Sequence, residues 1–113
     1  MAEDNSKWLP LLSAALGADA MSTDPEVLNA FSHDETEDLH AMPHVVCRPS
    51  STEEVAAIMR IAHEHGIPVT PAAARTGLSG GAIPVQGGIS LSMERLHRIL
   101  SIDEANFQAV VEP

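Results

Sequence analysis

Residues 44–70 read HVVCRPSSTEEVAAIMRIAHEHGIPVT, a run that predicts a strand, a helix and a second strand. Ser51 and Glu54 have the spacing of a helix capping box, and Gly66 lies where a glycine commonly ends a helix. The apolar face of this helix contains Val55, Ile58, Met59 and Ala62. A strand, a helix and a strand in this length form a βαβ unit, so we expect parallel strands joined by a right-handed connection.

The segment before this unit predicts two helices and a loop. Apolar residues recur at helical spacing in the first helix, with Ser6 as its expected N-cap and Gly17 as its end. A second, short helix is expected to begin beside Pro25, which suits a first helical position, and to run to about Phe31. The acidic segment 32–42 has little apolar content and is expected to be an exposed loop.

The segment after the unit predicts a loop and further strands. Residues 71–81 contain three glycines in five positions, which excludes a helix interior. Residues 87–88 are a glycine pair typical of a turn, and residues 89–93 alternate apolar side chains with serines, as in a strand with one buried face. A short strand is expected within 96–102 and a final one at 107–112. We therefore expect an α+β fold with a small mixed or parallel sheet, and the chain looks cut at the end of a strand.

Composition narrows the class of protein. The 113 residues contain 16 acidic and 6 basic side chains, a formal charge of −10, which argues against nucleic acid and anionic membranes as partners. Apolar residues make up 44%, enough for a core, whereas aromatic residues make up 3%, too few for a stacking platform. One cysteine excludes an internal disulfide. With no long apolar run and no signal-peptide pattern, a cytoplasmic setting is expected.

The glycine-rich loop is the strongest chemical feature. It follows the carboxyl end of a predicted parallel strand, where open α/β sheets place their ligands. Glycines let the backbone approach a ligand, and successive N–H groups can form an anion-binding nest. The spacing fits neither a P-loop nor a dinucleotide-binding glycine fingerprint. The loop is interpreted either as a site for a diphosphate or as a tight turn needed only for packing. Its candidate groups are Arg75, Thr76, Gly77, Ser79, Gly80 and Gly81.

Other chemistry-bearing residues form weaker patterns. His63 and His65, two residues apart on a helix, face different ways and are not expected to share a metal. Cys47 lies in an apolar strand and is expected in the core. No metal site is predicted, although four residues in and beside the acidic segment could in principle assemble one: His33, Asp34, His40 and His44. Four methionines are expected in or near the core: Met21, Met42, Met59 and Met93.

Several motifs together resemble a known family. They are residues 67–71 (IPVTP), 76–84 (TGLSGGAIP), 87–95 (GGISLSMER) and 110–113 (VVEP), with 32–38 (SHDETED) and 49–55 (PSSTEEV) upstream. The combination, over about residues 25–113, closely resembles the PCMH-type FAD-binding domain of the FAD-linked oxidases, also called the vanillyl-alcohol-oxidase type. Within it the match is nearest to the glycolate oxidase and D-lactate dehydrogenase branch.

The resemblance implies a cofactor and its binding residues. In that family the loop after the second strand wraps the FAD diphosphate with backbone N–H groups and a hydroxyl. Here Ala72, Ala73 and Arg75 stand where the family usually has arginine and glycines. Thr76 is the best single side-chain candidate. Carried over by position, the cofactor-binding residues are Pro71, Ala72, Ala73, Ala74, Arg75, Thr76, Gly77, Ser79, Gly80 and Gly81.

The resemblance also implies an activity. The expected function is the FAD-binding portion of an oxidoreductase that converts a 2-hydroxy acid, of the glycolate or D-lactate type, to a 2-oxo acid. Residues 1–42 would be a helical lead-in with an acidic loop, and residues 43–113 the first subdomain of the FAD domain. The remaining FAD and substrate domains are the expected partners, no catalytic residue is assigned here, and the isolated chain is expected to be inactive and to self-associate. The alternative is a free-standing, non-enzymatic α+β domain that binds a phosphate-bearing ligand or a partner chain.

Overall fold

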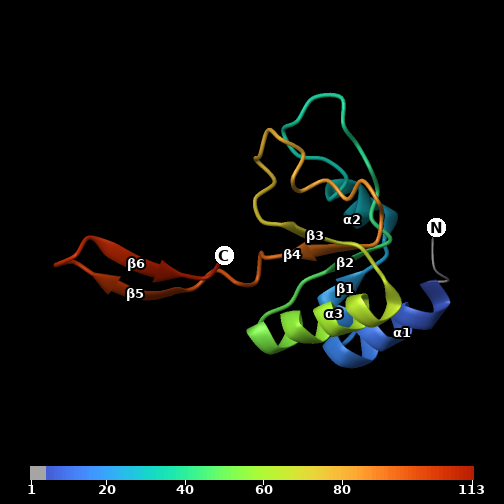
Figure 1. Ribbon diagram of the computed structural model, residues 1–113, viewed down its shortest axis with the longest axis horizontal. Helices are drawn as coiled ribbons and strands as arrows, with labels where there is room; N and C mark the ends of the chain where they lie inside the picture. Colours follow the sequence, from blue (N-terminus) through green and yellow to red (C-terminus); the bar gives the residue numbers. More distant parts are fainter. Residues whose placement is uncertain (1–4) are drawn as a thin grey trace.

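The computed structural model describes residues 5–113, which form a four-stranded sheet with helices and a separate two-stranded hairpin (Figure 1). The order along the sheet is β1-β2-β4-β3. The elements in chain order are α1 (Asn5–Leu16), the 3-10 turn η1 (Ala18–Ala20), β1 (Met21–Ser22), α2 (Pro25–Ala30), β2 (Val45–Cys47), α3 (Thr52–His65), β3 (Val69–Ala72), β4 (Ile89–Ser92), β5 (Ile99–Asp103) and β6 (Gln108–Val111). The predicted α+β class with a small mixed sheet is confirmed.

The βαβ unit has parallel strands, as predicted, but its two strands do not pair with each other. Both β2 and β3 pair in parallel with β4, which lies between them, so that Val45 and Val69 both face Ile89 in register. Strand β1 joins the outer side of β2 in the antiparallel sense. The turn before β4 has positive φ angles at Gly87 and Gly88, and the Gly88 N–H donates to Nδ1 of His44 at 2.8 Å.

The helices begin and end close to the predicted residues. Asp24 accepts a hydrogen bond from the Glu26 amide at the start of α2, and Ser51 accepts one from the Glu54 amide at the start of α3. Gly66 ends α3 in the left-handed conformation at φ 64°. The prediction that Ser6 is an N-cap is wrong, because α1 already includes it; residues 1–4 lie outside the described part of the chain.

Two packed layers cover the sheet. Helices α1 and α3 lie on one face, while α2 and the long loops lie on the other (Figure 1). Since side chains alternate along a strand, Val45 and Cys47 join the cluster beneath α1 and α3, and Val46 joins Phe31 and Ala72 on the loop side. The main cluster consists of Trp8, Leu12, Val45, Cys47, Ile58, Ala62, Ile89 and Leu91.

Burial departs from the sequence expectation at two places. Strand β4 was expected to have one exposed face, but Ser90 and Ser92 are buried as fully as their apolar neighbours because both faces of this central strand are covered. Met42 and Met59 are exposed, whereas Met21 and Met93 pack against the core as expected.

The hairpin of β5 and β6 projects away from the sheet (Figure 1). Every residue of both strands is exposed, and Phe107 at its turn is 98% exposed. The base of the hairpin is joined by Arg98, whose Nε donates to Oε1 of Glu112 at 2.7 Å. The apolar side chains that the hairpin leaves in solvent are Ile99, Leu100, Ile102, Phe107, Val110 and Val111.

Candidate cofactor-binding loop

The candidate loop begins where β3 ends at Ala72 and lies on the face of the sheet opposite α1 and α3 (Figure 1). Residues 73–82 form neither helix nor strand, as the glycines predict. The side chains of Thr76 and Ser79 are exposed, and Leu78 is 76% exposed. The loop therefore presents its hydroxyl groups and much of its backbone to solvent beside the carboxyl end of a parallel strand.

The backbone of the loop is bent at two positive φ angles. Arg75 has φ 57° and Gly80 has φ 76°, both in the left-handed region. A left-handed residue beside a right-handed one can turn successive N–H groups toward a common point, as in an anion nest. Among residues 5–113, no group accepts a hydrogen bond from the amides of residues 75–79 or of Gly81. These amides are free to donate to a ligand.

Gly80 differs from its neighbours because its amide is already used. Its N–H donates to Oγ1 of Thr36 at 2.8 Å, and three residues earlier the Gly77 carbonyl accepts from the Glu35 amide at 3.0 Å. Glu35 and Thr36 are not predicted as site residues, because the composition of 32–42 predicts an exposed acidic loop. The spacing Asp34-x-Thr36, typical of an Asx turn, is the signal that could have identified them.

Asp34 anchors this segment from inside the protein. It is only 8% exposed, and its Oδ1 accepts the Thr36 amide at 2.8 Å. Hydrogen bonding by Thr36, through its hydroxyl and then its amide, holds the pKa of Asp34 below the ordinary value of 3.8. Gly77 lies so close that an added Cβ would be 3.8 Å from Oδ2 of Asp34, in ordinary contact. The start of the acidic segment is therefore a packed, ionised support for the loop.

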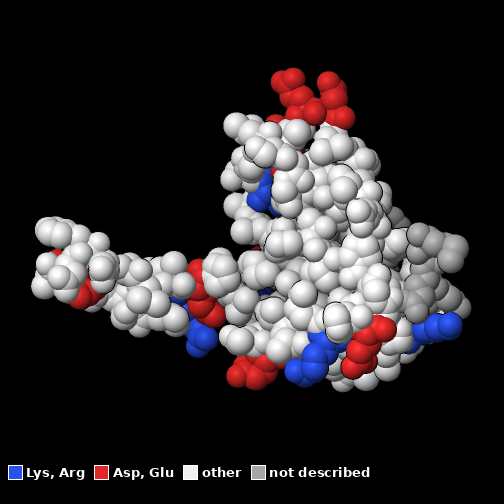
Figure 2. All heavy atoms as spheres, viewed as in Figure 1, with Lys and Arg blue, Asp and Glu red and all other residues white. Residues whose placement is uncertain are grey.

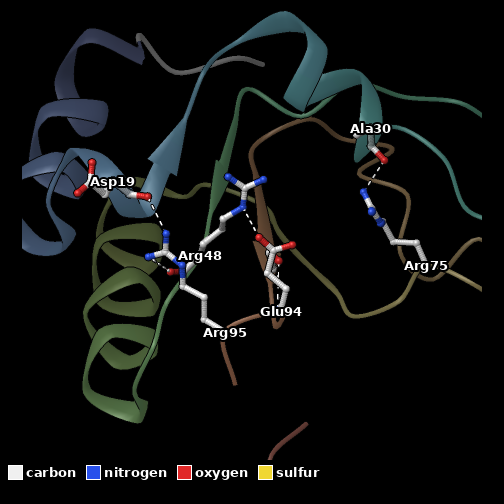
Figure 3. Close-up of polar contacts among 7 residues, drawn as sticks. Asp19, Ala30, Arg48, Arg75, Glu94 and Arg95 are labelled. Atoms are coloured by element: carbon white, nitrogen blue, oxygen red, sulfur yellow. Dashed lines mark hydrogen bonds and ion pairs between the residues drawn. The ribbon is translucent and has the colours of Figure 1, made fainter. Parts of the chain in front are cut away.

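Arg75 lies against the protein. Its Nη1 donates to the carbonyl of Ala30, the last residue of α2, at 2.6 Å (Figure 3), and its guanidinium lies 4.1 Å from the centre of the Phe31 ring. A shallow hollow of about 300 Å³ beside it is lined by Ala30, His33, Glu35, Ala74 and Arg75. The structure thus pairs Arg75, one of the candidate groups, with the end of α2.

The histidines and the cysteine considered in the sequence do not form a metal site in the described part of the chain. Among residues 5–113, no three His, Cys, Asp or Glu side chains gather closely enough to hold a metal ion. His44 supports the turn at Gly88, and His40 lies 3.5 Å from Oδ1 of Asn29. Burial raises the pKa of the Cys47 thiol to about 12, so it remains a neutral core residue. Acidic side chains gather at the outer end of the loops (Figure 2), where 32–42 is exposed at most positions.

A group of polar contacts, not anticipated from the sequence, ties the ends of β2 and β4 together (Figure 3). Nε of Arg48, just after β2, pairs with Oε1 of Glu94 at 2.5 Å. Arg95 reaches across to the Asp19 carbonyl at 3.0 Å and to the carbonyl of Arg48 at 3.5 Å. These contacts fix the carboxyl ends of β2 and β4, and β4 pairs with β3, the strand that the candidate loop follows. In the part of the chain that the structure describes, no helix is long and apolar enough to cross a membrane.

Comparison with known proteins identifies the family. The sequence profile of a family described as an FAD-binding domain matches residues 43–113. The chain belongs to this FAD-binding domain family. This FAD-binding chain is 42% identical over 88 residues to a D-lactate dehydrogenase of Anaerostipes hadrus, covering 77% of the chain and 18% of that protein. It is 39% identical over 83 residues to glycolate oxidase subunit GlcD of Bacillus subtilis, covering 74% of the chain and 18% of that protein.

Solved structures confirm the fold of the FAD-binding chain. A 4-ethylphenol oxidase from Gulosibacter chungangensis matches 98% of the chain and 22% of its own length, with a TM-score of 0.83 and 28% identity. An alkyldihydroxyacetonephosphate synthase, 18% identical, shares the fold with a TM-score of 0.83 over 96% of the chain and 24% of its own. The chain thus spans about a fifth of the length of these relatives. The resemblance noted in the motifs is confirmed.

The residues of the loop fit the cofactor of the family. An FAD diphosphate is an anion with several acceptor oxygens, and the loop offers unpaired amides at residues 75–79 with exposed hydroxyls at Thr76 and Ser79. Gly81 has nothing within 4 Å of an added Cβ, so its backbone is open to close approach.

Proposed function

We propose that this chain supplies the first part of the FAD site of an oxidoreductase that oxidises a 2-hydroxy acid, of the glycolate or D-lactate type, to a 2-oxo acid. The observation that carries the proposal is the row of unpaired amides at the end of β3 in a chain of the FAD-binding family. The substrate class is supported by the names of relatives at 42% and 39% identity, a D-lactate dehydrogenase and a glycolate oxidase component.

In this proposal the chain binds and orients the cofactor. The bound flavin supplies the acceptor for the hydride that leaves the α-carbon of the hydroxy acid. The amides of residues 75–79 donate to the diphosphate, and the hydroxyls of Thr76 and Ser79 add charge-assisted hydrogen bonds. Glycines at 77 and 81 keep side chains out of the space that the diphosphate occupies. The proposed cofactor-binding set remains Pro71, Ala72, Ala73, Ala74, Arg75, Thr76, Gly77, Ser79, Gly80 and Gly81.

We further propose that residues 1–42 form a lead-in, that residues 43–113 form the first subdomain of the FAD domain, and that additional polypeptide completes the FAD and substrate domains. The share of about a fifth of the relatives' length supports this organisation. So does the exposed apolar surface of the β5–β6 hairpin, which also supports self-association of the isolated chain. The chain together with the polypeptide that completes it is called the complete flavoprotein below. A cytoplasmic setting is part of the same proposal.

The cofactor assignment is tested with Thr76→Val and Gly81→Ala in the complete flavoprotein. Thr76→Val keeps the shape of the side chain but removes one hydrogen bond to a charged group, worth about 1.5–3 kcal/mol, so the FAD dissociation constant should rise roughly tenfold to a hundredfold. Gly81→Ala should weaken FAD binding without a loss of stability, because its Cβ meets no atom of the chain within 4 Å. The matched control, Thr23→Val, changes an exposed threonine outside the loop. Wild-type affinity in both loop variants would contradict the assignment.

The substrate class is tested separately from the cofactor site. The complete flavoprotein is mixed with glycolate, D-lactate or L-lactate in the absence of oxygen, and the flavin absorbance band is followed. Glycolate or D-lactate should bleach the band, because a hydride is transferred to the flavin, and L-lactate serves as the stereochemical control. A flavin that binds normally but is bleached by neither expected substrate would reject the substrate class while leaving the FAD site intact.

A further inference from the structure

The candidate loop is held by a segment far from it in the sequence. Nη1 of Arg75 donates to the Ala30 carbonyl at 2.6 Å, the Glu35 amide donates to the Gly77 carbonyl at 3.0 Å, and the Gly80 amide donates to Oγ1 of Thr36 at 2.8 Å. The last two contacts enclose the exposed tip of the loop from either side. The loop has no regular secondary structure, so these contacts carry much of what fixes its shape.

Thr36 is held through both its backbone and its side chain. Its Oγ1 accepts the Gly80 N–H at 2.8 Å, so this hydroxyl oxygen ties the loop to the acidic segment. Asp34 is itself fixed, since it is 8% exposed and its Oδ1 accepts the Thr36 amide at 2.8 Å. Asp34 thus holds the backbone of Thr36, and the side chain of Thr36 holds the amide of Gly80.

We propose that Thr36, its backbone anchored by Asp34, is a positioning residue for FAD binding that holds Gly80 in its left-handed conformation so that the neighbouring free amides face the diphosphate. The inference rests on the proposed role of the loop in the FAD site. Gly80 has φ 76°, and rotation there would redirect the peptide groups on either side of it. A loop held in the binding conformation before the ligand arrives loses less conformational entropy on binding, so the bond to Thr36 raises affinity without touching the cofactor.

A purely structural role for Thr36 predicts a different outcome. If the role were purely structural, Thr36→Val would lower the stability of the whole chain and would weaken FAD binding only by increasing the unfolded fraction. A positioning role predicts a local effect, in which the Gly80 amide loses protection from hydrogen exchange and FAD binds more weakly to protein that is fully folded. Thermal unfolding, hydrogen exchange and FAD titration on the same variants separate the two.

The experiment compares Thr36→Val with Thr36→Ser. Valine has the shape of threonine but no hydroxyl, whereas serine retains the hydroxyl. Hydrogen exchange is measured on the 113-residue chain, and FAD affinity by titration of the flavin-free complete flavoprotein. Thr36→Val should expose the Gly80 amide to exchange as rapid as that of residues 76–79 and raise the FAD dissociation constant roughly threefold to tenfold. Thr36→Ser should restore both toward wild type, and Thr23→Val should change neither.

The outcomes distinguish this inference from the proposed function. Normal FAD affinity in folded Thr36→Val, with Thr76→Val still impaired, would overturn the positioning role and leave the loop as the FAD site. Normal affinity in Thr76→Val, Gly81→Ala and Thr36→Val together would overturn both. Failure of Thr36→Ser to restore affinity would also overturn the inference, because the hydroxyl would then not be the group that matters.

Discussion

Arg75 is held in a left-handed conformation by contacts of its own side chain. Replacing it with glycine or with alanine separates the loss of those contacts from the strain of the backbone. Both variants lose the bond to the Ala30 carbonyl, worth about 1.5–3 kcal/mol for a charged donor, and the contact with Phe31, worth about 0.5–1 kcal/mol. Only glycine also removes the cost of φ 57° for an L-residue, about 1–2 kcal/mol. Arg75→Ala should therefore lower the free energy of unfolding by about 2–4 kcal/mol, and Arg75→Gly by about 1–2 kcal/mol less than that.

Urea unfolding of the 113-residue chain, followed by circular dichroism, measures these differences as shifts in midpoint at constant slope. Arg60→Ala, which removes an exposed arginine from α3, controls for the loss of charge and should change stability by less than about 0.5 kcal/mol. Equal destabilisation by glycine and alanine would refute the backbone-strain part of the reasoning. Wild-type stability in Arg75→Ala would refute the part that rests on Ala30 and Phe31.

Three further predictions concern the support of the site. Gly88→Ala should prevent folding, because its Cβ would lie 2.2 Å from the Pro68 carbonyl oxygen, and circular dichroism should show an unfolded chain. Gly17→Ala, with no atom within 4 Å of its Cβ, should fold and lose only about 1–2 kcal/mol through the strain of its φ, as measured by urea unfolding. Cys47 should not react with a thiol reagent at about pH 8 until the chain is unfolded, because burial raises its pKa to about 12; rapid reaction of folded protein would contradict its place in the core. Asp34 has a lowered pKa, so its contribution to stability is present above the ordinary value of 3.8 and is lost as pH falls through the lower folded value; unfolding midpoints from about pH 7 to 3 should fall less steeply in Asp34→Asn than in wild type.

Local sequence patterns predicted the helices and strands. The shape of the candidate loop could not be predicted, because it depends on contacts between residues far apart in the sequence. The capping spacing of Ser51 and Glu54 and the glycine at 66 act within one helix, so their geometry follows from the sequence alone. The bond from Gly80 to Thr36 joins residues 44 apart, and no periodicity records such a pair. Arg75 shows the same limit, because its left-handed φ contradicts its backbone preference and depends on tertiary contacts.

The strands and helix of the βαβ unit could be predicted from local patterns, but the pairing of its strands could not. Strand, helix and strand each have a local signature, whereas the place of β4 between β2 and β3 depends on which strands meet after folding. Ser90 is fully buried because both faces of this central strand are covered. Its alternation with apolar neighbours would normally indicate an exposed face.

The central position of β4 also has a consequence during synthesis of the chain. Neither β2 nor β3 has its parallel partner until residues 89–92 have emerged from the ribosome, so the βαβ unit cannot close its hydrogen-bond ladder as a nascent segment. Until then Val45 and Val69 lie on strands that lack the partner strand shared by both. Formation of the sheet is thus a late, cooperative event that brings together residues as distant as Val45 and Ile89, and such distant contacts slow folding. A chain that ends before Ile89 should therefore lack both parallel pairings of the sheet.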